Sequence, residues 1–76
     1  MDRIPGRIEA LCRAHTMRCL RDEGASVELI ARFFGYQPHN IVLLILWHER
    51  LYPVMPDFDE VGAPHLLDRF RKFHPP

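Results

Sequence analysis

The sequence predicts an all-α fold, a small helical domain of about four helices. Apolar residues recur every three to four positions along most of the chain, which is the spacing of one face of an α-helix. Glycines and prolines separate these periodic stretches from one another. The chain of 76 residues is long enough for one domain over residues 1–76. A domain this small has a marginal core, which a partner subunit often supplements.

The first helix is expected over about residues 4 to 23. Asp2 can cap its start, Pro5 suits its first turn, and Gly24 is a natural stop. One face of this helix carries Ile4, Ile8, Leu11, Cys12, His15 and Cys19. On one helix the Cα atoms of Cys12 and Cys19 would lie about 10 Å apart, which is too far for a disulfide. Free thiols indicate a reducing, cytoplasmic setting.

A short second helix is expected over about residues 27 to 34. Ser26 is its candidate N-cap, because a serine side chain accepts a hydrogen bond from the free amides of a first turn. Glu28 suits the positive end of the helix dipole. Gly35 is expected to end the helix.

The third helix is expected from Pro38 to Leu51. Pro38 suits a first turn, and Tyr52 precedes a proline that disfavours helical geometry. Every position of the run 41–47 is apolar, so a buried strand would also fit it. The polar residues 48–50 continue a helical pattern, and they favour the helix.

A proline-rich acidic loop is expected over about residues 52 to 64. Its carboxylates are Asp57, Asp59 and Glu60, and they lack the regular ligand spacing of an EF-hand calcium loop. They therefore predict a solvated loop. A C-terminal helix is expected over about 64 to 73, with one apolar face made of Leu66, Leu67, Phe70 and Phe73.

Composition and charge weigh against several classes of protein. Hydrophobic residues make up 47% of the chain, which excludes a disordered tail. The start of the chain lacks the apolar stretch of a signal peptide, and the longest apolar run has seven residues where a membrane span needs about 20. We therefore expect a cytoplasmic protein with no membrane contact. The net charge is zero, whereas nonspecific nucleic-acid binders usually carry a positive excess.

We expect no enzymatic activity and no cofactor. The sequence has neither a glycine-rich phosphate loop nor a nucleophile elbow, and no histidine has an evident nucleophile beside it. A small helical domain also has little room for a pocket of about 300 Å³ or more. Cys12, His15 and Cys19 share a helix face and are residue types that bind zinc, but their spacing favours core packing over a metal site.

A small residue and a glycine are spaced as in a known hairpin of two helices. Ala31 is followed four residues later by Gly35, and the apolar Ile41 comes six residues after the glycine, with Leu44 as the next core position. Over residues 26–51 this pattern resembles the helix-turn-helix superfamily. A small residue lets two helices cross closely, and a glycine adopts the left-handed conformation that the turn requires.

The resemblance implies a DNA-binding regulator. In DNA-binding members the second helix of the pair enters the major groove, so the base-reading residues here would be Gln37, His39 and Asn40. Four arginines on the first helix fall within an arc of roughly 60° and would contact phosphates. They are Arg3, Arg7, Arg18 and Arg21. The alternative is that these arginines form an ordinary solvated face, balanced by nearby acidic residues.

The outer face of the third helix departs from the family. Polar or basic residues are expected there, but this chain has apolar ones, and no lysine or arginine lies between Arg32 and Arg50. A helix that is apolar all round must be covered by the fourth helix, the loop or a second chain. The candidate protein interface is Val42, Leu43, Leu46 and Trp47.

Two hypotheses for the function follow. The first is a small DNA-binding regulator that acts as a homodimer. The second is a protein-binding module on a helix-turn-helix-like scaffold, such as an inhibitor of a host protein complex encoded by a phage or mobile element. The shape of the hairpin favours the first, whereas the zero net charge and the apolar third helix favour the second.

Overall fold

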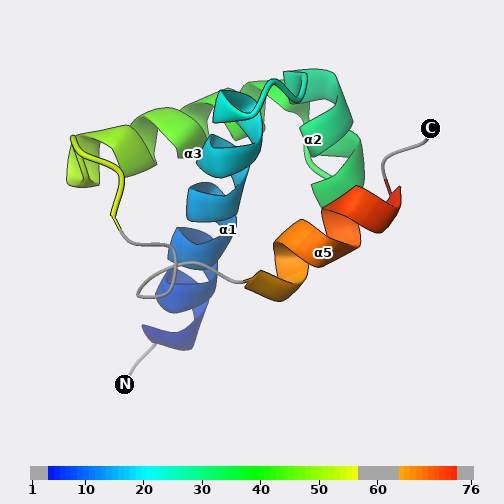
Figure 1. The fold of residues 1–76 in the computed structure, drawn as a ribbon. Coiled ribbons are helices and arrows are strands. Elements are labelled where there is room, and N and C mark those ends of the chain that lie inside the picture. Colours follow the sequence, from blue (N-terminus) through cyan, green and yellow to red (C-terminus); the bar gives the residue numbers. More distant parts are fainter. Residues whose placement is uncertain (1–3, 57–63, 74–76) are drawn as a thin grey trace.

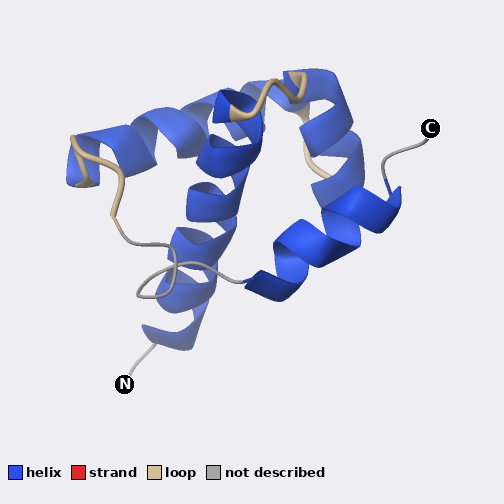
Figure 2. Ribbon diagram, viewed as in Figure 1, coloured by secondary structure: helices blue, strands red, loops and turns tan. Residues whose placement is uncertain are grey.

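The computed structural model of the protein describes residues 4–56 and 64–73, with side chains from residue 9 to 56 and from 66 to 73. These residues form four α-helices and no strand, so the predicted all-α fold is confirmed (Figures 1 and 2). The helices are α1 (Ile4–Asp22), α2 (Val27–Phe34), α3 (Pro38–Leu51) and α5 (Pro64–Phe73). The run 41–47 is therefore helical, and the alternative of a buried strand is wrong.

The expected start and stop signals act at the ends of α2. The Ser26 side chain accepts a hydrogen bond of 3.1 Å from the backbone amide of Leu29. Gly35 adopts a left-handed conformation with φ 76°, and its amide donates to the carbonyl of Ala31 at 2.8 Å. Gly24, with φ 103°, plays the same part after α1. The expected cap Asp2 lies outside the described residues.

Helix α1 is the centre of the fold, and the other helices pack around it. Helix α3 crosses one side of α1, and α5 lies against α1 and α2 on another (Figure 1). The axes of α2 and α3 meet at 98° across the turn at Gly35. The shared core consists of Met17, Leu20, Ile30, Ala31, Ile41, Ile45 and Phe70.

An aromatic cluster joins α5 to α2. The centre of the Phe33 ring lies 5.4 Å from the centre of the Phe70 ring and 5.5 Å from that of the Phe73 ring, and both pairs meet edge-on. Phe33 also meets Phe34 edge-on at 4.9 Å. Such edge-to-face pairs add to the stability that burial of the rings provides. The predicted apolar face of the C-terminal helix therefore meets the second helix, not the outer side of the third.

The middle of α1 is buried on every side, which differs from the single buried face that the sequence predicts. The residues from 14 to 18 are all buried, and so is Leu20. The reason is the central position of α1, because neighbouring helices cover several of its faces. On the expected face His15 is buried and Leu11, Cys12 and Cys19 are half-buried, whereas Ile4 and Ile8 lie outside the described side chains.

Within the described part of the chain, none of the individual helices combines the length and the apolar character of a membrane span, and only α2 and α3 taken together as a bent pair meet that test on length and composition.

Candidate functional site

Helix α3 has a buried face and an exposed apolar face on opposite sides. Ile41, Ile45 and His48 face the core. On the other side Val42, Leu43 and Leu46 remain 42%, 49% and 54% exposed. The sequence predicts a cover for this side, but no part of the described chain provides one. An exposed apolar patch of this kind is typical of an interaction site.

The exposed residues form a narrow stripe along the helix, which we call the α3 stripe and define as His39, Val42, Leu43, Leu46 and Arg50. At about 100° per residue these five positions fall within roughly 100° of arc. Steps of four, three and four residues separate His39, Leu43, Leu46 and Arg50, which is the spacing of a coiled-coil seam. The half-buried Trp47 borders the stripe and, with Leu43 and Leu46, lines an open hollow of about 510 Å³.

The three candidate base-reading residues are accessible at the start of α3. Gln37, His39 and Asn40 are all exposed. Gln37 is the N-cap residue, but its side chain makes no capping hydrogen bond. Its backbone carbonyl accepts from the amide of Asn40 at 2.9 Å. His39 belongs to the α3 stripe, so it shares a surface with Leu43 and Leu46.

The predicted arginine stripe on α1 does not form a continuous solvated surface, because Arg18 is buried. Helix α3 crosses α1 at this level, and the guanidinium of Arg18 is enclosed between them. Its Nη1 donates to the backbone carbonyl of Tyr52 at 2.8 Å, and Tyr52 is the C-cap of α3. Arg18 therefore satisfies a carbonyl at the end of a different helix, where a positive charge is also favourable. The expectation that it contacts phosphate from a solvated position is wrong.

Arg21 is engaged as well. Its Nη2 donates to Glu49 at 2.7 Å and to Asp22 at 2.9 Å, so an ion pair links α1 to the last turns of α3. Arg3 lies outside the described residues, and the side chain of Arg7 lies outside those that the structure describes. Of the four predicted phosphate contacts, the two with described side chains thus hold the protein's own helices together.

A buried polar cluster lies behind the last turns of α3, and its members are His15, Arg18 and His48. The two imidazole rings meet edge-on at 5.2 Å. Arg18 Nη1 also lies 3.2 Å from His48 Nδ1, and a guanidinium can only donate. His48 Nδ1 must therefore accept, which places the ring proton on Nε2. His48 Nε2 is buried with no hydrogen-bond partner among the described residues.

The cluster favours neutral histidines. Burial, and next the neighbouring His15 and Arg18, lower the pKa of His48 to about 4. Burial also lowers the pKa of His15, although its Nε2 lies 3.3 Å from the carbonyl of Pro56. The cluster is closed to solvent, and through Arg18 it anchors the end of α3 on α1. The sequence contains a signal for it, since His48 falls at the next core position after Ile41 and Ile45.

The three residues weighed as zinc ligands have other surroundings. His15 Nδ1 lies 3.8 Å from Cys19 Sγ, and Cys12 is half-buried further along α1. Over residues 9–56 and 66–73, no three histidine, cysteine or acidic side chains come together as a metal site. Burial, and next Glu23 and Asp22, raise the pKa of the Cys19 thiol. The acidic loop residues Asp57, Asp59 and Glu60 lie outside the described part.

Comparisons with protein family models, with curated proteins and with solved structures find no match to this chain.

Proposed function

We propose that this chain is a protein-binding module that pairs with a second copy of itself along the α3 stripe. The observation that carries the proposal is the exposure of Val42, Leu43 and Leu46 side by side on one helix. Single exposed apolar residues are common on protein surfaces, but a contiguous row flanked by polar residues is typical of an interface.

The apolar residues of α3 are arranged so that they complement themselves. A two-fold axis between Leu44 and Ile45 would pair the helices in antiparallel fashion. Leu43 then faces the partner's Leu46 at the centre of the stripe. The apolar centre of the stripe thus meets the same surface of the partner, which a symmetric dimer requires.

The polar ends of the stripe are compatible with this arrangement. The same axis brings His39 opposite the partner's Arg50, and a neutral imidazole can accept a hydrogen bond from a guanidinium. No pair of carboxylates or of guanidinium groups is placed face to face.

The charges of the chain favour a protein partner. The net charge is zero, and Arg18 and Arg21 already contact Tyr52 and Glu49 within the chain. They contribute little positive potential to the surface. The apolar part of this interface is small, because it consists of four side chains on a helix of 14 residues: Val42, Leu43, Leu46 and Trp47. We therefore expect a weak dimer with a dissociation constant on the order of 10 to 100 μM.

Sedimentation equilibrium tests the proposal over protein concentrations from about 10 μM to about 1 mM. We expect a monomer–dimer equilibrium that Leu43→Lys shifts towards monomer, because the lysine would lie against the partner's Leu46. The control is Val54→Lys, since Val54 is 83% exposed and lies outside the stripe. A wild-type protein that stays monomeric at about 1 mM overturns the proposal, as does equal weakening by both variants.

A second candidate function is a DNA-binding regulator. Two observations favour it: the angle of 98° between α2 and α3, and the exposure of Gln37, His39 and Asn40 at the start of α3. Helix-turn-helix pairs cross at about 90° to 120°, and their second helix presents its leading end to the bases. This use competes with the dimer described above, because His39 belongs to the α3 stripe.

Fluorescence anisotropy with a random DNA duplex at low salt tests this second function. A DNA-binding protein is expected to bind with an affinity that falls steeply as salt rises. Leu43→Lys separates the two functions, because the added positive charge strengthens binding to DNA and breaks the dimer. Asn40→Ala should weaken the preference for a specific sequence. Absence of binding at tens of micromolar protein rejects this candidate.

A further inference from the structure

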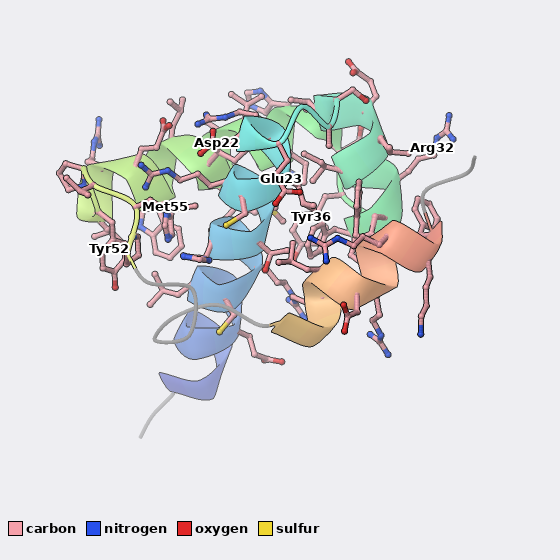
Figure 3. The ribbon with its side chains drawn as sticks, in the orientation of Figure 1. Asp22, Glu23, Arg32, Tyr36, Tyr52 and Met55 are labelled. Atoms are coloured by element: carbon pink, nitrogen blue, oxygen red, sulfur yellow. The ribbon has the colours of Figure 1, made fainter. Side chains whose placement is uncertain are left out.

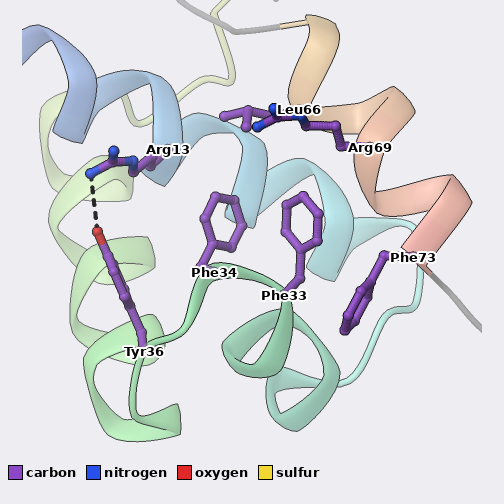
Figure 4. A pocket seen from close by; sticks show the side chains of 7 residues that line it. All are labelled: Arg13, Phe33, Phe34, Tyr36, Leu66, Arg69 and Phe73. Atoms are coloured by element: carbon purple, nitrogen blue, oxygen red, sulfur yellow. Dashed lines mark hydrogen bonds between the residues drawn. The ribbon is translucent and has the colours of Figure 1, made fainter.

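A second hollow lies between α1, α2 and α5, and it shares no lining residue with the hollow on α3. Its volume is about 510 Å³, within the range of about 300 to 1,000 Å³ that is usual for small-molecule sites. The sequence predicts little room for such a pocket in so small a domain. The difference arises because α5 meets α2 through aromatic side chains that leave space between the helices. Figure 4 shows the residues around this space.

The walls of this pocket are aromatic. Phe33 stands at 84° to the ring of Phe34 and at 61° to the ring of Phe73, so the rings present both faces and edges to the hollow. Tyr36 closes one side (Figure 4). Phe73 is exposed although it is large and apolar. A flat apolar ligand would cover it and would meet several rings in the offset and edge-on geometries that aromatic pairs prefer.

Two arginines add positive charge to the rim. Arg13 comes from α1 and donates to the hydroxyl of Tyr36 at 3.3 Å, while its contact with Glu9 is long, at 3.9 Å and exposed to solvent. Arg69 comes from α5 and extends over the phenylalanine rings (Figure 4). It is exposed, and the ion pairs between described side chains do not include it. The rim therefore places two guanidinium groups beside the aromatic walls.

We propose that this pocket binds a small aromatic carboxylate. The ring system lies among Phe33, Phe34 and Phe73, and the carboxylate meets Arg69 and Arg13 at the rim. A guanidinium presents parallel donors that match the two oxygens of a carboxylate, which makes this pairing stronger and more directional than one with a point charge. This binding site is independent of the dimer along the α3 stripe.

The test uses two probes of the same shape, 2-naphthoate and its neutral analogue 2-naphthamide. Each is titrated into the ¹⁵N-labelled protein, and binding is followed by amide chemical shifts. We expect millimolar binding of the naphthoate, with the largest shifts at Phe33, Phe34 and Tyr36. The naphthamide should bind about tenfold weaker, because it lacks the charge that Arg69 and Arg13 recognise.

A matched pair of variants isolates the role of the rim. Arg69→Met should weaken naphthoate binding about tenfold and remove the preference over naphthamide. Arg71→Met is the control, because Arg71 is exposed on the same helix but does not line the pocket. Equal binding of the two probes overturns the proposal, and so do shifts confined to the α3 stripe or equal losses in the two variants. A protein with no pocket shifts at about 10 mM naphthoate overturns it too.

Discussion

Acidification should destabilise this protein through His48, well above the pH at which carboxylates take up protons. The ring is buried, its Nδ1 faces Arg18, and burial with the neighbouring His15 and Arg18 lowers the pKa of His48 from 6.5 to about 4. Glu49 acts in the opposite direction but is the smallest influence. In the unfolded chain the imidazole titrates normally, so below pH 6.5 the unfolded state binds a proton that the folded state excludes.

The magnitude follows from the difference between the two pKa values. Well above pH 6.5 the imidazole is neutral in both states and contributes no pH dependence. As the pH falls from 6.5 to about 4, the free energy of unfolding drops by about 3 kcal/mol, of which about 2 kcal/mol is lost by pH 5. A domain of 76 residues has a total stability of roughly 4 to 11 kcal/mol, so this loss is a large fraction of it.

Urea unfolding followed by the fluorescence of Trp47 measures this effect between about pH 7.5 and pH 5. The control is His48→Gln, whose side-chain oxygen can still accept from Arg18 but cannot titrate. We expect the wild type to lose about 2 kcal/mol over this range and the variant to lose clearly less, with a remainder from His15. Equal losses in both proteins would refute the reasoning. A folded-state NMR titration of His48 with a midpoint near pH 6.5 would refute it as well.

Three further predictions concern single side chains. Ser26→Ala should lower the free energy of unfolding by about 1 kcal/mol in urea denaturation, because the amide of Leu29 loses its cap, and Ser26→Asp should restore most of it. Gly35→Ala should lower the free energy of unfolding by roughly 1 to 2 kcal/mol in the same assay, because alanine is strained at the left-handed φ of 76°. Steric overlap plays no part, since an added Cβ meets no atom within 4 Å. Cys19 should react with iodoacetamide more slowly than the thiol of an unstructured peptide at pH 8, because its pKa is raised, and equal rates would contradict this.

The boundaries of the helices could be predicted because local signals set them. Ser26 and Gly35 act within one turn of the residues that they cap. Pro38 begins α3 and the proline after Tyr52 ends it, again through geometry within a few residues. Interactions between residues this close in the chain can be recognised from the sequence alone. The observed bounds of α2, α3 and α5 therefore agree with the expected ones.

The surroundings of α1 could not be predicted in the same way. A helix that packs at the centre of a fold has several buried faces, and which faces these are depends on how the other helices cross it. Arg18 is expected at the surface because arginine usually lies there, yet it is enclosed where α3 crosses α1. The pocket near Arg69 has the same origin, since it exists only because α5 approaches α2 at the level of Phe33.

The exposed side of α3 is an intermediate case. The sequence shows that positions 41–47 are apolar all round, and it therefore predicts a surface in need of a partner. It does not show which positions the rest of the chain covers. That follows from the tertiary packing, which buries Ile41 and Ile45 and leaves Leu43 and Leu46 to solvent.

The two ends of α3 are held in different ways. Tyr52, which caps the carboxyl end, is labelled in Figure 3. The first turn follows the tight loop at Gly35 and depends on residues close in the chain. The last turn is held by Arg18, which is 34 residues away from the carbonyl that it satisfies. Exchange of the amide protons in the last turns should therefore follow the separation of α3 from α1, whereas the exposed first turn, whose leading amides have no partner one turn earlier in the helix, can exchange without it.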